Sequence, residues 1–478
     1  MKTPTTQNSW ALLTITSILA ISSAQAANVF WDGGGGDSAW NNPLNWDTDT
    51  VPVSGDIVNI GSGEYVTHDH ASNLTGGITI NLDGELNTAG VLRWSGTTTN
   101  VGSTGIISGG FKDLNGGTLN FQDGAQFTAS AWEHKATNVF DFELSSTGFT
   151  ALTPGTLFSN GATSTTYRAD LANYSGATQD VTLVDFGGDN TGLTNATFTG
   201  GGQYTLGIDN SGTNAARLYW DDATDAVKLS INETVTWTGG GANNLLSNGD
   251  NWDAADGKGP ISYDTLVINN GDTVAHANNL PFAATIDLVG SELTTDGSVI
   301  RLNNSTINVD ASSTLSGNFW DLDGANIVFE NGAQVNMASW EQKDLNSFTF
   351  ELGAYDFTTL TPTNFFIGNG SLTGDIANAT YIADFSNFAS YSEFNLGFNS
   401  ITLMDFTTDF AGMDNAQFQS ASFDYLNMGA NIEDAAFAWD DSLEAIVLTF
   451  NITAVPEPSS TALLGLGGLA LALRRKRS

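Results

Sequence analysis

Paired cations and tryptophans are the recurring side chains of this sequence that could bind a ligand. Arg93 in VLRW is matched by Arg301 in VIRL, and Trp-Glu-His-Lys at 132–135 is matched by Trp-Glu-Gln-Lys at 340–343. An indole can stack on a sugar ring while charged side chains hydrogen-bond the sugar hydroxyls. The candidate ligand-binding residues are Arg93, Trp132, Glu133, Lys135, Arg301, Trp340, Glu341 and Lys343.

The same residues also fit a structural role, which the sequence favours over binding. In that interpretation each Glu and Lys form an ion pair, and each Trp fills the core between strands. Of the 14 Lys and Arg, Lys2 and the four at 474–477 lie near the ends of the chain, which leaves nine for the body. Four of those nine fall in the matched pairs, so the repeated unit requires them for structure at least.

The histidines give little support for catalysis or metal binding. His134 is replaced by Gln342 in the matched segment, so a catalytic histidine is not expected to act in both copies. His68 and His276 match each other, but a metal site needs several converging ligands, and the spacing shows none. We expect both to be structural or exposed, and no metal ligand is assigned.

Paired carboxylates are plentiful and therefore weak evidence for an enzyme. Asp221-Asp222 and Asp440-Asp441 are the most motif-like. Glycoside hydrolysis needs two carboxylates facing each other across a cleft, but adjacent strand residues face opposite sides. The segment 321–324 resembles the first positions of a calcium-binding loop, but the rest of the EF-hand pattern does not follow. We expect no catalytic residue and no cofactor, with Ca²⁺ as the one candidate.

The composition excludes several classes of partner. The chain has 52 acidic and 14 basic residues and a formal net charge of -38 at pH 7. Nucleic acid is excluded because no cationic surface exists to release its counterions. The chain has no cysteine, so disulfides and thiol catalysis are excluded as well.

The elements that must position these side chains occur twice. The segments 113–133 and 321–341 are identical at nine of 21 positions without a gap. Further matches extend over the whole body, which divides into two homologous halves at 27–232 and 233–453.

Within each half the pattern predicts β-strands and no long helix. Short alternating runs are separated by Gly, Asn and Asp turns at a spacing of roughly 15 to 20 residues, which suits the coils of a β-solenoid. The later strands of each half are more aromatic and more widely spaced. They fit either further coils or an antiparallel, sandwich-like layer. The predicted fold is all-β, with two tandem β-solenoid or β-helix-like halves that carry additional strands.

The two ends of the chain have the composition of export signals. An apolar segment at 11–21 precedes Ala24-Gln25-Ala26, so we expect a signal peptide at 1–26 with cleavage after Ala26. At the other end, 462–473 is apolar apart from glycine, which predicts a short hydrophobic helix. It is shorter than the about 20 residues of a full membrane span, so we expect a transient or weak anchor. Its flanking residues are Pro456, Glu457, Pro458, Arg474, Arg475, Lys476 and Arg477.

The tail at 454–478 resembles the sorting segment of PEP-CTERM proteins of Gram-negative, exopolysaccharide-producing bacteria. Its Pro-Glu-Pro, apolar run and cationic block occur in the matching order. The resemblance implies an exosortase as processing partner, transient insertion in the inner membrane, and delivery to the envelope, cell surface or extracellular matrix.

The opening segment is similar to those of autotransporter-type β-helix proteins. Trp31, the glycine run 33–36, Trp46 and Asp56 carry this similarity, which supports the fold rather than a function.

The sequence therefore indicates a secreted surface or matrix protein with a structural, non-enzymatic role. An extracellular polysaccharide-binding module is the alternative, with exopolysaccharide as the partner and Ca²⁺ as a bridge. A glycan hydrolase or lyase is the least favoured interpretation.

Overall fold

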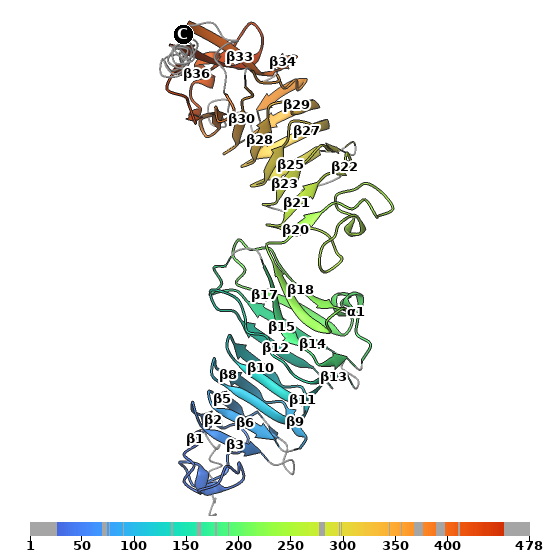
Figure 1. Ribbon diagram of the computed structural model, residues 1–478, viewed down its shortest axis with the longest axis vertical. Helices are drawn as coiled ribbons and strands as arrows, with labels where there is room; N and C mark the ends of the chain where they lie inside the picture. The colour runs from blue at the N-terminus through green and yellow to red at the C-terminus, as the bar shows by residue number, and fades with distance from the viewer. Residues whose placement is uncertain are drawn as a thin grey trace, which may run out of the picture.

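The computed structural model describes most of the body and neither extreme end. The predicted signal peptide up to residue 25 and the sorting tail at 454–478 lie outside the described residues. Figure 1 shows the described chain as an elongated stack of strands. The described residues are 26–453 without 69–73, 76, 89, 135–136, 160–163, 177–178, 190, 277–282, 296, 298, 344, 355, 368–375, 389–396 and 410–411.

In the first half the chain alternates between two parallel sheets, which we call sheet 1 and sheet 2. Successive rungs of sheet 1 pair in register, and residues that face each other are 22, 19 and 20 positions apart. Sheet 1 comprises β1 (Asn28–Phe30), β2 (Ile57–Ile60), β5 (Thr79–Leu82), β8 (Thr98–Val101), β10 (Thr118–Gln122), β12 (Asn138–Glu143), β14 (Thr165–Asp170) and β17 (Tyr204–Asp209). Sheet 2 comprises β3 (Tyr65–His68), β4 (Leu74–Thr75), β6 (Glu85–Thr88), β7 (Leu92–Ser95), β9 (Ile106–Asn115), β11 (Gln126–His134), β13 (Thr156–Ser159) and β16 (Gly188–Asp189).

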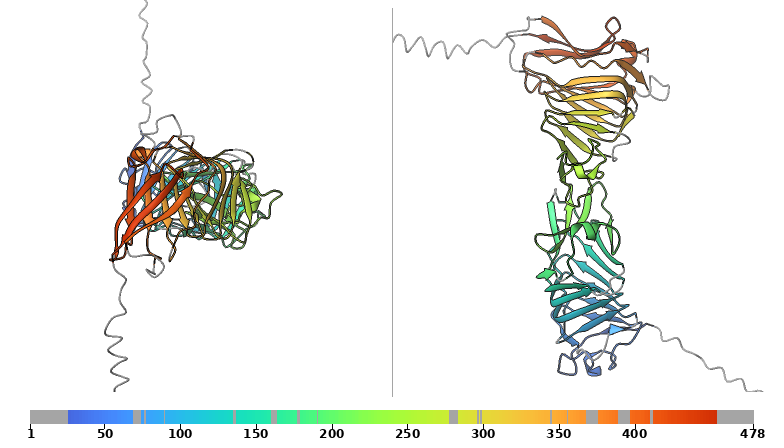
Figure 2. Two further views of the ribbon diagram at one scale, coloured as in Figure 1. Left: turned by 90° about the horizontal axis from the view of Figure 1, so that it is seen from above. Right: turned by 90° about the vertical axis from the view of Figure 1, so that its right-hand side faces the viewer.

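The second half repeats this arrangement in sheets 3 and 4. Figure 2 shows its strands stacked along the same long axis as those of the first half. Sheet 3 comprises β20 (Thr234–Thr236), β21 (Thr265–Ile268), β23 (Thr285–Leu288), β26 (Thr306–Val309), β28 (Asn326–Glu330), β30 (Ser347–Glu351), β32 (Thr380–Asp384) and β35 (Ser422–Leu426). Sheet 4 comprises β22 (Thr273–His276), β24 (Glu292–Thr295), β25 (Val299–Asn303), β27 (Thr314–Asp323), β29 (Gln334–Gln342), β31 (Asn364–Ile367) and β34 (Thr408–Asp409).

Each half ends in a three-stranded antiparallel sheet, so both interpretations of its later strands contribute to the fold. Parallel pairing in sheets 1 and 3 continues to β17 and β35. The antiparallel strands form a separate sheet in each half and are interleaved with these strands in the chain. Those strands are β15 (Gln179–Asp185), β19 (Ala226–Ile231) and β18 (Ala216–Asp221), and then β33 (Gly397–Asp405), β37 (Ala445–Ile452) and β36 (Ile432–Asp440).

The all-β prediction is confirmed. Helical segments are one turn or so long: η1 (Pro43–Asn45), α1 (Asn195–Thr199), η2 (Gly249–Asn251) and α3 (Asn415–Phe418). Among the described residues, no helix has the length and apolar character needed to cross a membrane.

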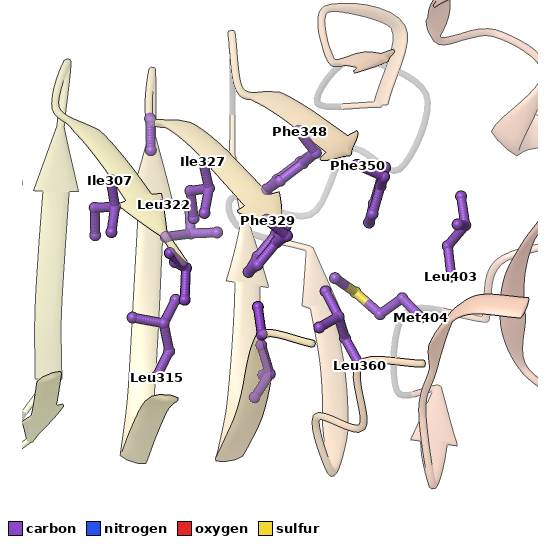
Figure 3. Packing of buried hydrophobic residues seen from close by; sticks show 14 of the residues in the cluster. Ile307, Leu315, Leu322, Ile327, Phe329, Phe348, Phe350, Leu360, Leu403 and Met404 are labelled. Atoms are coloured by element: carbon purple, nitrogen blue, oxygen red, sulfur yellow. The ribbon is translucent and has the colours of Figure 1, made fainter. Parts of the chain in front are cut away.

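Strand alternation fills the interior with stacked apolar side chains. In β5, Ile80 and Leu82 are at most 1% exposed, while the alternate residues Thr79 and Asn81 face outward. Aromatic rings stack from rung to rung, as between Phe121 and Phe142 at a centroid distance of 5.8 Å. The equivalent pair in the second half, Phe329 and Phe350, lies at 5.9 Å (Figure 3). The buried side chains form two clusters, within 29–231 and within 235–452.

Trp and Gly segments close the first rung of each half. Trp46 is fully buried, packs edge-on against Trp31 at 5.0 Å, and donates from Nε1 to a backbone carbonyl at 2.8 Å. Gly35 donates its N–H to the buried side chain of Asn45 at 2.9 Å. A Cβ at Gly35 would lie 2.7 Å from that same Asn45 oxygen, so only glycine permits the contact. The second half repeats the contact between Gly241 and Asn251.

A buried arginine joins the two halves. Arg217 on β18 is 5% exposed and pairs with Glu233 at 3.2 Å, Asp256 at 3.0 Å and the fully buried Asp264. Its Nη1 also donates to the carbonyl of Gly259 at 2.8 Å. Burial raises the pKa of Asp264 to about 6, and the guanidinium acts in the opposite direction. Arg217 therefore supplies positive charge to three carboxylates that begin the second half.

We predict that Arg217→Met lowers the free energy of unfolding by about 3–5 kcal/mol, because it leaves buried carboxylates without their cation. Urea unfolding followed by tryptophan fluorescence measures the change. The matched control is Arg168→Met, since the side chain of Arg168 is 43% exposed. This substitution should lower the free energy of unfolding by at most about 1 kcal/mol. Equal losses in the two variants would contradict a special role for the junction.

Candidate functional site

The two candidate tryptophans lie in the core. Trp132 on β11 is fully buried and Trp340 on β29 is 1% exposed. Trp132 packs against Phe127 at 4.6 Å and Phe140 at 4.7 Å, and Trp340 packs against Phe348 at 5.3 Å. Neither indole presents a face to solvent, so neither can stack on a sugar in this fold. The core-filling alternative is the one that matches their position.

The charged candidates of the second half lie around Asp321, which the sequence marked as the possible start of a calcium loop. Arg301, Asp321 and Glu341 face one another across β25, β27 and β29. Asp321 is 5% exposed, and its carboxylate pairs with Arg301 at 3.2 Å and Lys343 at 2.7 Å. Lys343 thus pairs with Asp321, at the position that the sequence marked as the start of a calcium loop.

The equivalent positions of the first half are also in register. Arg93 is exposed, and the strand register pairs position 93 with 113 and position 113 with 133. Glu133 is 9% exposed, and Lys135 lies outside the described residues. The strand register thus places Arg93 and Glu133 in the first half, and Arg301 and Glu341 in the second, at equivalent positions two strands apart. In the second half Arg301 and Lys343 form an ion-paired cluster with Asp321, without the tryptophan platform.

Lys112 of β9 is buried and is not among the candidate residues that the sequence suggests. Its Nζ donates to the carbonyl of Ser108 at 2.8 Å and to the hydroxyl of Thr88, and burial lowers its pKa to about 7. Trp320 occupies the equivalent place in β27 and donates from Nε1 to the carbonyl of Ser316 at 3.0 Å. One backbone acceptor is thus satisfied by a lysine in one half and a tryptophan in the other.

A glycine corner explains why this lysine points inward. Gly109 has a φ of 91°, and a Cβ there would lie 2.2 Å from the carbonyl oxygen of Thr88. The corner shifts the alternation of β9, so that Ile107 before it and Lys112 after it are both buried. Regular alternation would place positions an odd number of residues apart on opposite faces.

The remaining candidates take structural positions. His68 and His276 are 1% and 3% exposed, and burial lowers the pKa of His276 to about 4. Asp221 pairs with Lys228, and this partner lowers the pKa of Asp221 to about 2. Asp440 accepts hydrogen bonds in its own turn, from the hydroxyl and N–H of Ser442.

These acids do not gather into a larger cluster in the part of the chain that the structure describes. There, no group of three or more His, Asp or Glu side chains is arranged to hold a metal ion.

A polar groove of about 580 Å³ follows the outward face of sheet 1. Its floor includes a ladder of asparagines in which each side-chain N–H donates to the amide oxygen of the rung before it. The distances are 2.9 Å for Asn81 to Asn59, 2.9 Å for Asn100 to Asn81, and 2.7 Å for Asn120 to Asn100. The next rungs continue this row with Asp141 and Arg168, whose side chains form a two-bond pair at 2.5 Å.

A second outward row runs beside the ladder, two residues further along each strand. It places Gln122, Glu143, Asp170 and Asp209 on successive rungs. With Asp83 and Asp141, the groove lining contains five carboxylates and the single guanidinium of Arg168. The groove therefore combines hydrogen-bonding amides with an excess of negative charge.

We predict that Lys112→Met removes a pH dependence of stability. The folded pKa of about 7 lies below the unfolded value near 10.5, so the unfolded chain binds more protons between these pH values. Wild-type stability therefore gains a contribution as the pH rises through this window, by up to about 1.4 kcal/mol per unit. Urea unfolding from pH 7 to 9.5 should show the stability of the variant relative to wild type falling steadily.

The control for this prediction is Lys228→Met, which removes a partly exposed lysine and should leave the slope unchanged. Parallel profiles for wild type and Lys112→Met would show that the buried amine carries no such penalty.

Comparison with known proteins identifies the tail. Residues 454–477 match the PEP-CTERM protein-sorting motif. No match extends to the tryptophan and glycine segments that suggested autotransporter-like repeats. No curated protein and no solved structure matches the chain. The motif indicates a protein that an exosortase sorts to the exterior of a Gram-negative cell.

Proposed function

We propose that this protein is a structural, non-enzymatic component of the cell surface or extracellular matrix, built as a β-solenoid rod from two duplicated halves. The sorting motif carries the location, because it provides the means of export. The rod-like stack of strands is the observation that supports a structural role. Cleavage near Pro456 releases the body from the short apolar tail.

Continuous parallel pairing supports the rod. Neighbouring strands of sheet 1 and of sheet 3 share backbone hydrogen bonds from one end of each sheet to the other. The buried Arg217 cluster supports a fixed connection between the halves, since separation would expose Asp264 and its partners. Asn195 adds a hydrogen bond across the same junction, from Nδ2 to the carbonyl of Ala255 at 3.0 Å.

A polysaccharide-binding module is the second candidate function. The observation that favours it is the polar groove on sheet 1, rather than the buried tryptophans. A hydrolase or lyase has less support. The acids noted in the sequence, Asp221 and Asp440, are used in turns and ion pairs.

We predict that the native secreted protein begins at Ala27 and ends near Pro456. Replacing Pro456, Glu457 and Pro458 with alanine should keep Arg474 to Arg477 on the chain and hold it in the membrane fraction, because the exosortase no longer recognises the tail. Intact mass and C-terminal peptide mapping of both fractions measure this.

Two outcomes would contradict the proposal. A wild-type chain that keeps its cationic end and stays in the inner membrane would make the tail a plain anchor. Release of reducing ends or unsaturated sugars from the producer's own polysaccharide, with or without Ca²⁺, would make the protein an enzyme.

A further inference from the structure

We propose that the groove on sheet 1 binds an extended polysaccharide that carries free amino groups. This deepens the second candidate function, and the structural role stands independently of it. The groove residues offer amides, carboxylates and one guanidinium on the outward rows, and the aromatic residue in the lining, Phe121, is only 1% exposed. Binding must therefore rest on hydrogen bonds and charge, which hydroxyl and ammonium groups supply.

The asparagine ladder presents unused hydrogen-bonding capacity along the groove. An asparagine amide has two N–H donors, and the ladder bond uses one of them. At the end of the ladder, Asn120 Oδ1 is buried from solvent and accepts no hydrogen bond from any described residue. A ligand hydroxyl could accept a hydrogen bond from the second N–H of these amides, which the ladder bond leaves over.

The charge of the groove selects among glycans. Its five carboxylates exceed its one guanidinium, and Arg168 is already neutralised by Asp141 at 2.5 Å, with Asp209 3.8 Å away. Glu143 accepts hydrogen bonds from the side-chain amides of Gln122 at 3.3 Å and Asn173 at 3.2 Å. A polyuronate would be repelled, while an ammonium group would gain a charge-assisted hydrogen bond.

The groove also has the form that an extended polymer requires. Successive rungs lie about 4.8 Å apart, so equivalent groups recur along the stack axis at roughly the length of one sugar ring. The equivalent row of the second half contains Asp287 and Asn308 but then Val328, Thr349 and Ile382. The ladder and the guanidinium are thus properties of the first half alone.

The test uses glucosamine oligomers as the probe, with fully N-acetylated oligomers and a polyuronate as the other arms. Isothermal titration should show binding of the glucosamine oligomer to the secreted protein. Its affinity should fall at least tenfold in the double variant Glu143→Gln, Asp209→Asn, and the other two glycans should bind at least tenfold more weakly than glucosamine.

The matched control is the double variant Glu330→Gln, Glu351→Gln, which makes the same charge change on the equivalent outward row of the second half. It should keep wild-type affinity. An equal loss in both double variants, equal binding of the N-acetylated oligomers, or no binding at all would each overturn the proposal. None of these outcomes bears on whether the chain is sorted or forms a rod.

A separate observation concerns the first residue of the mature chain. Asp56 and Asp264 precede equivalent strands, β2 and β21, and each accepts the backbone N–H of the residue three positions earlier at 2.8 Å. Asp264 is paired with Arg217, which belongs to the half before it. Asp56 belongs to the first half, and the group at its Oδ1 is the backbone nitrogen of Ala27, at 3.1 Å.

We infer that cleavage after Ala26 creates the cation that Asp56 uses. This rests on the predicted signal peptide: cleavage of the peptide bond to Ala26 converts the Ala27 nitrogen from an amide into a terminal ammonium. The ammonium then pairs with Asp56 as the guanidinium of Arg217 pairs with Asp264. Pairing with an anion favours the protonated amine and protects it from amine-reactive reagents.

Pulse labelling of the secreted protein with an amine-reactive reagent at pH 8, read out by peptide mapping, tests this inference. The α-amine of Ala27 should react several-fold more slowly in wild type than in Asp56→Asn, while Lys228 reacts equally in both. Equal rates at Ala27, or a mature chain that begins at another residue, would overturn the inference.

Discussion

In-register parallel pairing is the constraint on which the rest of this structure depends. When the side chain at one position faces the equivalent side chain of the rungs above and below it, every row must be compatible with itself. Inside, this is achieved by apolar rows such as Val101, Phe121 and Phe142, in which the two phenylalanine rings stack at 5.8 Å. Outside, it is achieved by the asparagine ladder, in which Asn81 and Asn100 each donate to one neighbour and accept from the other.

A stack of parallel strands leaves open edges, and the fold closes each one with a different device. An open edge exposes backbone groups that can pair with another chain. The first edge is covered by the buried Trp46 and Asn45, the junction is covered by the Arg217 cluster, and the last is followed by the antiparallel strands β33, β37 and β36. At the junction, a buried cation meets the carboxylates of the neighbouring half.

The sequence predicts the periodic features well and the irregular ones poorly. Alternation, turn residues and duplication predict the all-β body, and the tail is recognisable from its composition. The buried Lys112 was missed because Gly109 bends β9 and shifts the alternation, which a linear pattern does not reveal. The sequence places Trp132 among the binding candidates because the same residue type recurs at the matched position, next to charged residues. The groove is not evident in the sequence because its residues come from six rungs that are 19 to 39 positions apart.

Duplication separates the residues that the fold requires from those that are free to act. Residues present in both halves are structural wherever their side chains are described as buried: Trp132 and Trp340 fill the core, and Gly109 and Gly317 turn corners where a Cβ would lie 2.2 Å from a neighbouring atom. A requirement of the rung explains such a match fully, so the match does not indicate a ligand. The outward row behaves differently, since Arg168 in one half faces the same direction as Ile382 in the other. A position that tolerates both a guanidinium and an isoleucine is not fixed by packing, and its chemistry is therefore available for recognition.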